Sequence, residues 1–351
     1  MKRITTEDCV RIEKDLFFID SECNIIYKMG IENGIISIIG SIPEENLLMP
    51  RLGAKIVYLD NKLFFSPMNA KKIWRYDLAT REWKGFARKV YGALNCGHMF
   101  QAVEHDKKIF FLGSSYPAII VLDTITERIE YIEKPYEYLN EKAQEENDSY
   151  FRTDYVKIDN KIYMASCVSN EIFVFDLDTY KFEFVAIGEK NYRYSGIMYD
   201  GNKYYLSPRK NTPIVTWDGK NTEYYTLPQM FLDKNEMIFG GVCCDKDIIV
   251  FPSVFWNKSI VIDDKNDISS LKIIDESYYF YKTIDNKTLI NLKRPNMMTI
   301  KFEGKEYKYT LEIDEKTVYK YLKSCKERVS GDYIVNENKN VDIKMFINAI
   351  L

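Results

Sequence analysis

Short apolar runs separated by short polar turns recur along the whole chain, and they predict β-strands. The clearest copy has apolar runs at 55–59 and 63–67 on either side of the turn Asp60-Asn61-Lys62. A third run ends in Tyr76-Asp77, and a fourth begins near Trp83. Asp, Asn and Gly suit such turns because they tolerate positive φ and hydrogen-bond their own backbone. The pattern predicts a unit of four short antiparallel strands.

This unit recurs along the chain in seven copies. The first residues of its second strand are Leu16, Leu63, Ile109, Ile162, Tyr204, Ile248 and Thr288, at spacings of 47, 46, 53, 42, 44 and 40 residues. A second landmark, an Asp that closes the third strand, recurs in phase at Asp77, Asp123, Asp176, Asp218 and Asp263. A period of about 45 residues with four strands per unit is the signature of propeller blades.

Several runs are apolar at consecutive positions, such as 248–251, which is typical of strands buried on both faces. Each sheet must therefore pack between neighbouring sheets, and closing the series into a ring leaves only short, protected edges. We predict an all-β, seven-bladed β-propeller over residues 1–314, with a six-bladed ring as the alternative. Each blade is expected to own its four strands, with Glu7 to Ile12 as the first strand of the first blade.

The rhythm of strands stops after Ile313, where apolar residues change to helical spacing. One helix is predicted from Val318, Leu322, Cys325 and Val329, and a second from Ile343, Phe346, Ile347, Ile350 and Leu351. We expect residues 315–351 to form a helical tail packed on the propeller, although Tyr333-Ile334-Val335 could add a strand.

The long 53-residue spacing reflects a charged insertion at 136–150. This stretch predicts a short helix or a mobile loop between the third and fourth units. It could be a solvated insertion or a lid over the central opening of the ring.

Composition narrows the class of protein. The 351 residues are 46% hydrophobic and 15% aromatic, which is ample for a core. A net charge of −3 gives no basic excess, so we expect no nucleic-acid partner. No apolar run of about 18 residues predicts a membrane span, and no apolar stretch follows the basic N-terminal residues as in a secretion signal. Seven unpatterned Cys fit reduced thiols, so we expect a cytoplasmic protein.

The phrase from Tyr76 to Trp83, with Asp and Thr between, resembles the kelch repeat, as do the Asp-Thr turns at Asp123 and Asp176. The resemblance covers about residues 7–314. The kelch double glycine is essentially absent, so the chain resembles a degenerate, kelch-like bacterial-type propeller. Gly240-Gly241 is the one such pair in a comparable place, and it precedes a first strand. The resemblance implies the propeller fold and a general role as a binding platform, and it carries over no catalytic residue.

Motifs for metal, nucleotide or nucleophilic chemistry are missing. His98 and His105, the only two His, lie at opposite ends of one predicted strand, and no CxxC or HxxxH accompanies them. The sequence has no GxGxxG before a helix, no GxxxxGK[ST] and no GxSxG. We therefore expect no metal and no cofactor, and we interpret the turn aspartates as structural.

The remaining argument is geometric. In propellers the lead-in segments, which precede each first strand, share one face with the loops that join strands two and three; we call this the loop face. Its candidate ligand-binding residues are Arg51, His98, Arg152, Tyr194, Arg209, Trp256 and Tyr278. The guanidinium groups of the arginines and the faces of the aromatic rings there could hold an anionic or sugar-like ligand. In the plainer interpretation the arginines pair with loop carboxylates, and the Ser-Pro pairs after strand two only end the strands.

The sequence favours a non-catalytic binding or scaffold propeller that recognises a protein or a glycan-type ligand on its loop face. The alternative is a carbohydrate-active enzyme, such as an epimerase, mutarotase, lyase or hydrolase, with an axial pocket. In that case Arg51, Arg152 and Tyr194 would bind the substrate and His98 would be the acid or base. A third hypothesis is a structural partner of another enzyme that uses the tail or the blade edges.

Overall fold

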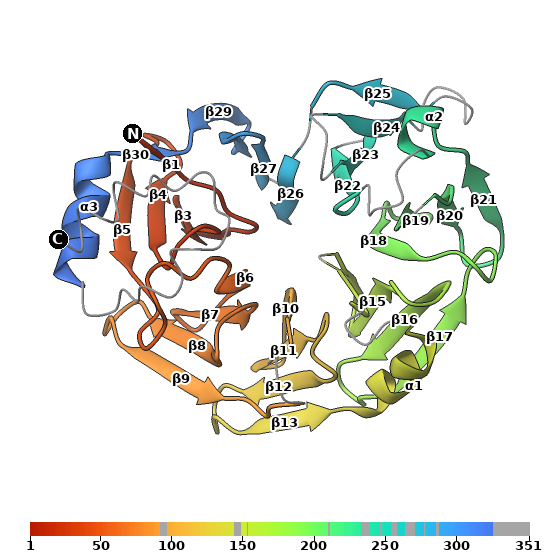
Figure 1. The fold of residues 1–351 in the computed structure, drawn as a ribbon, viewed down its shortest axis with the longest axis horizontal. Helices are drawn as coiled ribbons and strands as arrows, with labels where there is room; N and C mark the ends of the chain where they lie inside the picture. The colour runs from red at the N-terminus through yellow and green to blue at the C-terminus, as the bar shows by residue number, and fades with distance from the viewer. Residues whose placement is uncertain are drawn as a thin grey trace. The chain divides into compact units, whose positions relative to one another are not determined.

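Seven four-stranded antiparallel sheets form the blades of a β-propeller, with a few short helices beside them (Figure 1). The computed structural model describes residues 1–91, 97–143, 149–152, 154–209, 211–232, 239–245, 248–253, 258–263, 271–276, 278–285 and 288–325. The predicted fold class is confirmed, and the seventh sheet excludes the six-bladed alternative. The chain forms two compact units, residues 1–98 with 279–351, and residues 99–278.

Three blades belong to the first unit. The first blade comprises β2 (Val10–Ile12), β3 (Asp15–Ile19), β4 (Ile26–Gly30) and β5 (Ile36–Gly40). The second comprises β6 (Gly53–Leu59), β7 (Lys62–Pro67), β8 (Lys72–Asp77) and β9 (Trp83–Ala87). The seventh comprises β26 (Tyr278–Asp285), β27 (Thr288–Lys293), β28 (Met297–Phe302) and β29 (Lys305–Thr310). The unit also contains β1 (Lys2–Arg3), β30 (Glu312–Ile313) and α3 (Glu315–Ser324).

The second unit contains the other four blades. The third blade comprises β10 (Gln101–His105), β11 (Lys108–Leu112), β12 (Ile119–Asp123) and β13 (Ile129–Ile132), and α1 (Lys134–Lys142) follows it. The fourth comprises β14 (Val156–Ile158), β15 (Lys161–Ala165), β16 (Glu171–Asp176) and β17 (Phe182–Ala186). The fifth comprises β18 (Tyr194–Tyr199), β19 (Tyr204–Pro208), β20 (Ile214–Trp217) and β21 (Thr222–Tyr225), and α2 (Gln229–Leu232) follows it. The sixth comprises β22 (Cys243–Asp245), β23 (Ile248–Pro252), β24 (Ser259–Asp263) and β25 (Lys272–Ile274).

The position of a strand in its blade follows from its hydrophobic pattern. The second and third strands are apolar at consecutive positions and are buried on both faces, as in β7 and β12. Fourth strands such as β17 consist of half-buried and exposed residues, because one face is open to water. Within each unit, Figure 1 shows the labelled first strands, such as β6 and β18, on the inner side and the fourth strands on the outer side.

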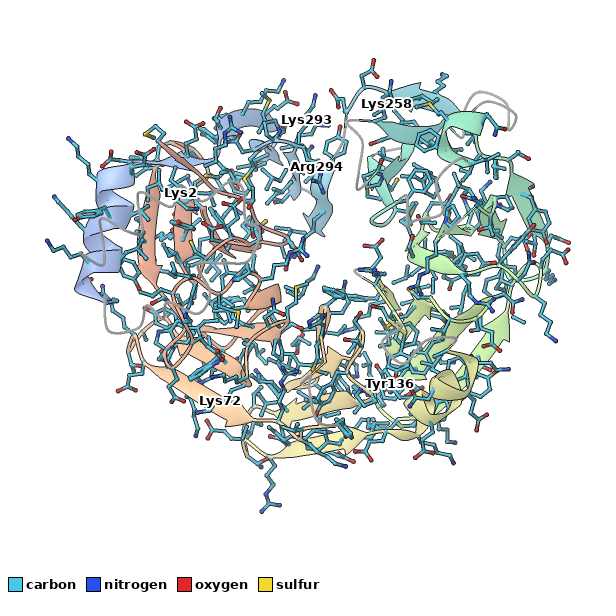
Figure 2. The ribbon with its side chains drawn as sticks, in the orientation of Figure 1. Lys2, Lys72, Tyr136, Lys258, Lys293 and Arg294 are labelled. Carbon is cyan, nitrogen blue, oxygen red and sulfur yellow. The ribbon has the colours of Figure 1, made fainter. Side chains whose placement is uncertain are left out.

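The two ends of the propeller region meet in the first unit. β1 pairs antiparallel with β30, so that Lys2 lies opposite Ile313. The side chain of Lys2, labelled in Figure 2, is buried and lies 2.5 Å from Oδ2 of the fully buried Asp20. Burial alone would lower the pKa of Lys2, but the attraction and hydrogen bond of Asp20, together with Cys23 and Glu22, outweigh burial and raise that pKa. The ion pair therefore fixes β1 to the first blade, while the strand pairing fixes it to β30.

Helix α3 packs against the first unit through its apolar stripe. Val318 and Leu322 are buried in one cluster with residues of the first and seventh blades. Asp314 caps the helix by accepting a hydrogen bond from the Thr317 backbone N–H at 3.1 Å. The predicted second tail helix and the possible strand at Tyr333 lie outside the described residues.

Most details of the predicted organisation are confirmed. Each of the seven sheets is built from four strands that are consecutive in the sequence, as expected. The first strand of the first blade begins at Val10 rather than at Glu7. The insertion forms the helix α1, whose Tyr136, labelled in Figure 2, is buried and donates to the Gly113 carbonyl at 3.0 Å. In the described residues, no helix is long and apolar enough to cross a membrane.

Candidate functional site

Backbone hydrogen bonds join the lead-in segments to the loops between strands two and three, within each unit. In the first unit, Arg51 N–H donates to the Ser21 carbonyl at 3.1 Å, and Asn69 N–H donates to the Arg51 carbonyl at 3.0 Å. In the second unit, Tyr150 N–H donates to Ser114 and Tyr194 N–H donates to Ser166. These segments therefore share one face in each unit, which is the loop face that propeller geometry predicts.

Arg51 is an exposed candidate in the first unit. Its backbone has a φ of 50°, and its side chain is 56% exposed. Its Nε lies 2.9 Å from the carboxylate of Glu7 in the lead-in segment of the first blade. The plainer interpretation, an arginine paired with a loop carboxylate, therefore describes this contact. Because the pair is exposed to water, its contribution to stability is small.

Two of the candidates serve the interior of the second unit. Tyr194 is fully buried and donates to the Ile187 carbonyl at 2.6 Å, and burial raises the pKa of its hydroxyl. Arg209 donates to the Cys167 carbonyl at 2.7 Å and fixes that loop from within. These hydrogen bonds give both side chains a structural role, and their assignment to a ligand stays a prediction.

Arg152 differs from those two. Its guanidinium lies 5.9 Å from the centre of the Phe100 ring, and its Nε is buried without a hydrogen-bond acceptor among the described residues. An unsatisfied buried donor costs about 1–3 kcal/mol, so an arginine in this state is a candidate for ligand contact.

The other three candidates have mixed environments. His98, which precedes β10, is half-buried and has partners of its own. The hydroxyl of half-buried Tyr278 donates to Glu276 at 2.5 Å. Trp256 lies outside the described residues. The seven candidates belong to two units, Arg51 and His98 to the first and the other five to the second, so each group is described by itself.

A polar cluster that the sequence analysis missed lies at the start of the first strands in the first unit. Asp8, two residues before β2, is 3% exposed. Its Oδ1 lies 2.8 Å from Nζ of Lys282 in β26 and 3.4 Å from Nζ of Lys55 in β6. Its Oδ2 accepts the Ile56 backbone N–H at 3.1 Å. One carboxylate therefore links the seventh, first and second blades.

The charge state of Asp8 follows from these contacts. Burial alone would raise the pKa of this carboxyl, because it penalises the charged form. The ammonium groups of Lys282 and Lys55, with the Ile56 N–H, outweigh burial and lower the pKa below its ordinary value. Asp8 is therefore ionised at neutral pH. The same burial raises the pKa of the neighbouring Cys9 thiol to about 12, so that thiol stays protonated.

Asp154 holds the corresponding position in the second unit, two residues before β14. Its Oδ2 accepts the Val242 backbone N–H at 2.8 Å. A Cβ added at Gly241 would lie 2.2 Å from that oxygen, and one added at Gly196 would lie 2.5 Å from it. The two glycines therefore make room for a carboxylate that connects the fourth, fifth and sixth blades.

A signal for this position was present in the sequence. Eight residues before the predicted start of strand two stand Asp8, Lys55, Gln101, Asp154, Gly196, Gly240 and Phe280. Six of these seven residues are polar or glycine. The turn and the Asp that closes the third strand define the period of the repeat, but they do not mark this column near the start of the first strand.

The recurrent turn aspartates have the structural role that was predicted for them. In the turns at Asp77, Asp123, Asp176 and Asp218 the carboxylate accepts the backbone N–H groups two and three residues ahead. These hydrogen bonds lower the pKa of the carboxyl, to about 2 for Asp218. Across the described parts of the chain, no group of three or more His, Cys, Asp or Glu is arranged to hold a metal ion.

Comparison with solved structures finds the same architecture in proteins of low sequence identity. A streptogramin B lyase matches with a TM-score of 0.57 and 15% identity over 88% of this chain and 94% of that one. The virginiamycin B lyase of Staphylococcus aureus matches with a TM-score of 0.57 and 12% identity over 89% of this chain and 98% of that one. BamB of Moraxella catarrhalis matches with a TM-score of 0.53 and 13% identity over 82% and 81%. These similarities establish the fold.

Comparison with known sequences does not assign the chain to a family. No protein-family profile matches the chain. A RING finger protein of Plasmodium falciparum, PFE0100w, is 22% identical over 234 residues, which is 59% of this chain. The match spans 17% of the length of that relative. The functional argument therefore rests on the residues of this chain.

Proposed function

We propose that this chain is a non-catalytic binding propeller that holds a protein or a glycan-type ligand on its loop face. The observation that carries the proposal is the backbone hydrogen bonding of the lead-in segments to the neighbouring loops, as between Arg51, Ser21 and Asn69. Such bonds fix the loops before a ligand arrives. A surface fixed in advance loses less conformational entropy on binding, which favours recognition.

Each unit contributes one proposed ligand contact from its own loops, Arg51 in the first unit and Arg152 in the second. Arg51 offers an exposed guanidinium that forms an ion pair with Glu7. Arg152 carries a buried Nε without an acceptor among the described residues, and a nearby ring holds its guanidinium in place. Guanidinium groups suit carboxylates, phosphates and sugar hydroxyls because they present several donors in a fixed plane.

Thermal unfolding in the presence of candidate ligands tests the proposal. The panel contains neutral sugars, acidic sugars and phosphates, and the double variant Arg51→Ala, Arg152→Ala is measured beside the wild type. A ligand at a hundred times its dissociation constant should add about 2.7 kcal/mol of stability. Stabilisation that is equal in the double variant would refute the role of the arginines. If the panel gives no stabilisation, capture of a protein partner by the wild type but not by the double variant becomes the deciding measurement.

The repeat is, in our proposal, kelch-like. The ring of Trp83 lies 4.8 Å from that of Tyr76 and 6.4 Å from that of Trp74, so the phrase that resembles kelch makes a compact aromatic contact in the second blade. We also propose a cytoplasmic location, because the buried Cys9 and Cys23 are free thiols. Recovery of the protein outside the cell in fractionation would argue against this location.

An enzyme of carbohydrate chemistry is the second candidate function. Two of the fold neighbours are described as lyases, and each covers nearly the whole of this chain. His98 remains the acid or base in this hypothesis, because it is half-buried at the start of β10. Replacing His98 with Gln should abolish turnover of a sugar substrate while the melting temperature stays the same. Unchanged turnover would remove His98 from the mechanism.

A further inference from the structure

The cluster of Asp8, Lys55 and Lys282 contains more positive charge than its carboxylate can neutralise. Two ammonium groups face one oxygen of Asp8, at 3.4 Å and 2.8 Å. The second oxygen of Asp8 is occupied by the Ile56 N–H. Counting these three side chains alone, the cluster keeps one net positive charge.

The donors of the two lysines are only partly used. An ammonium group has three N–H donors. Lys282 directs donors to Asp8 and to the Cys9 carbonyl, both at 2.8 Å. Lys55 lies near Asp8 alone. Within the described part of the chain, neither ammonium group contacts a further acceptor, so up to three donors remain for a ligand or for water.

The two ammonium groups are also held in place and reachable. The side chain of Lys55 is 20% exposed and that of Lys282 is 23% exposed, so water has access to both. Their common partner Asp8 is buried and has no freedom to follow them into solvent. Because the pair is fixed before binding, a ligand that bridges it would order little additional structure.

We propose that Lys55 and Lys282 form a binding site for an oxyanion, either the carboxylate of an acidic sugar or a phosphate group. An ammonium group acts as a point charge and does not select a planar over a tetrahedral anion, so both ligands share the required chemistry. This inference rests on the proposed binding function and names the class of ligand.

Lys55→Gln is the variant that tests the site. Asp8 keeps its closer partners, Lys282 and the Ile56 N–H, so the variant should fold. The matched control is Lys28→Gln, which removes a lysine from another ion pair of the first unit, the exposed pair with Asp15. Circular dichroism and thermal unfolding confirm that both variants are folded.

Binding is measured by isothermal titration calorimetry at constant ionic strength, with inorganic phosphate, glucuronate and neutral glucose. The wild type and Lys28→Gln should bind phosphate or glucuronate and should not bind glucose. Lys55→Gln should bind the same anion at least about tenfold more weakly, and Lys55→Arg should restore binding. The anion that binds identifies which of the two groups the site prefers.

Equal binding by the wild type and Lys55→Gln would overturn the proposal, as would a wild type that binds neither anion. If Lys55→Gln fails to fold, salt gives the second test: affinity that stays constant between about 0.05 M and about 0.5 M ionic strength would exclude a charge-based site. A ligand lost in the Arg51→Ala, Arg152→Ala variant but retained in Lys55→Gln would overturn the lysine site and leave the proposed function standing.

Discussion

Replacing Asp8 with Ala should destabilise the first unit by about 3–5 kcal/mol. Removing one partner of a buried ion pair typically costs that amount. The loss of the acceptor for the buried Ile56 N–H costs about 1–3 kcal/mol more. Lys55 and Lys282 are about one-fifth exposed, so partial rehydration of their ammonium groups offsets some of the loss. These opposing effects leave the total within the stated range.

Asp8→Asn separates charge from hydrogen bonding. The amide oxygen can still accept from Ile56 N–H, so we expect about half the loss of the Ala variant. Urea unfolding at neutral pH measures the free energy of unfolding of the wild type, Asp8→Ala and Asp8→Asn. The control is Asp15→Asn, from the partly exposed pair with Lys28, with an expected loss below about 1 kcal/mol. A loss below about 1 kcal/mol for Asp8→Ala would refute the view that this carboxylate links the blades.

The pH dependence gives an independent check on Asp8. Its pKa is lowered in the folded protein, so its stabilisation is complete above the unfolded pKa of about 3.9 and is lost as the pH falls through the folded value. The difference in stability between wild type and Asp8→Asn should therefore be constant from about pH 7 to pH 5 and shrink below about pH 4. If the difference in stability between wild type and Asp8→Asn stayed constant down to acid pH, the charge of Asp8 would have no role in stability.

Three further predictions concern other buried groups. Gly241→Ala should destabilise by about 1–3 kcal/mol in urea unfolding because its Cβ would displace Asp154, and it should cost less in an Asp154→Ala background; additive losses would exclude the contact. Lys2→Met should cost about 3 kcal/mol because Asp20 would stay buried without its ammonium partner, and a melting curve equal to wild type would show that the pair is dispensable. Cys23 should resist thiol reagents in the native state because burial raises the pKa of its thiol, and rapid labelling without unfolding would contradict this.

The sequence predicted the blades because blade formation depends on local signals. Turn residues such as Asp60 and Asn61 adopt positive φ, at 48° and 60°, as the turn chemistry requires. The Asp that closes a third strand accepts backbone N–H groups of the next few residues, as Asp77 does from Ala79 and Thr80. Such signals repeat in every blade, so their period indicates the architecture.

The site was harder to predict because its contacts join residues far apart in the chain. Asp8 and Lys282 are 274 residues apart, and no local pattern links them. Residue type alone did not separate Tyr194, which is buried in the core, from Arg51, which is exposed. The side-chain environment that decides between packing and binding is set by neighbouring blades, and a single sequence does not show which residues those are.

The pairing of β1 with β30 has a consequence for protein engineering. Because Lys2 lies opposite Ile313, the start and the finish of the blade-forming chain are adjacent. A short linker could join them, and new termini could then be opened in an exposed turn elsewhere, such as the one at Gly201, where an added Cβ would meet no atom within 4 Å. Such a circular permutant should keep its seven blades.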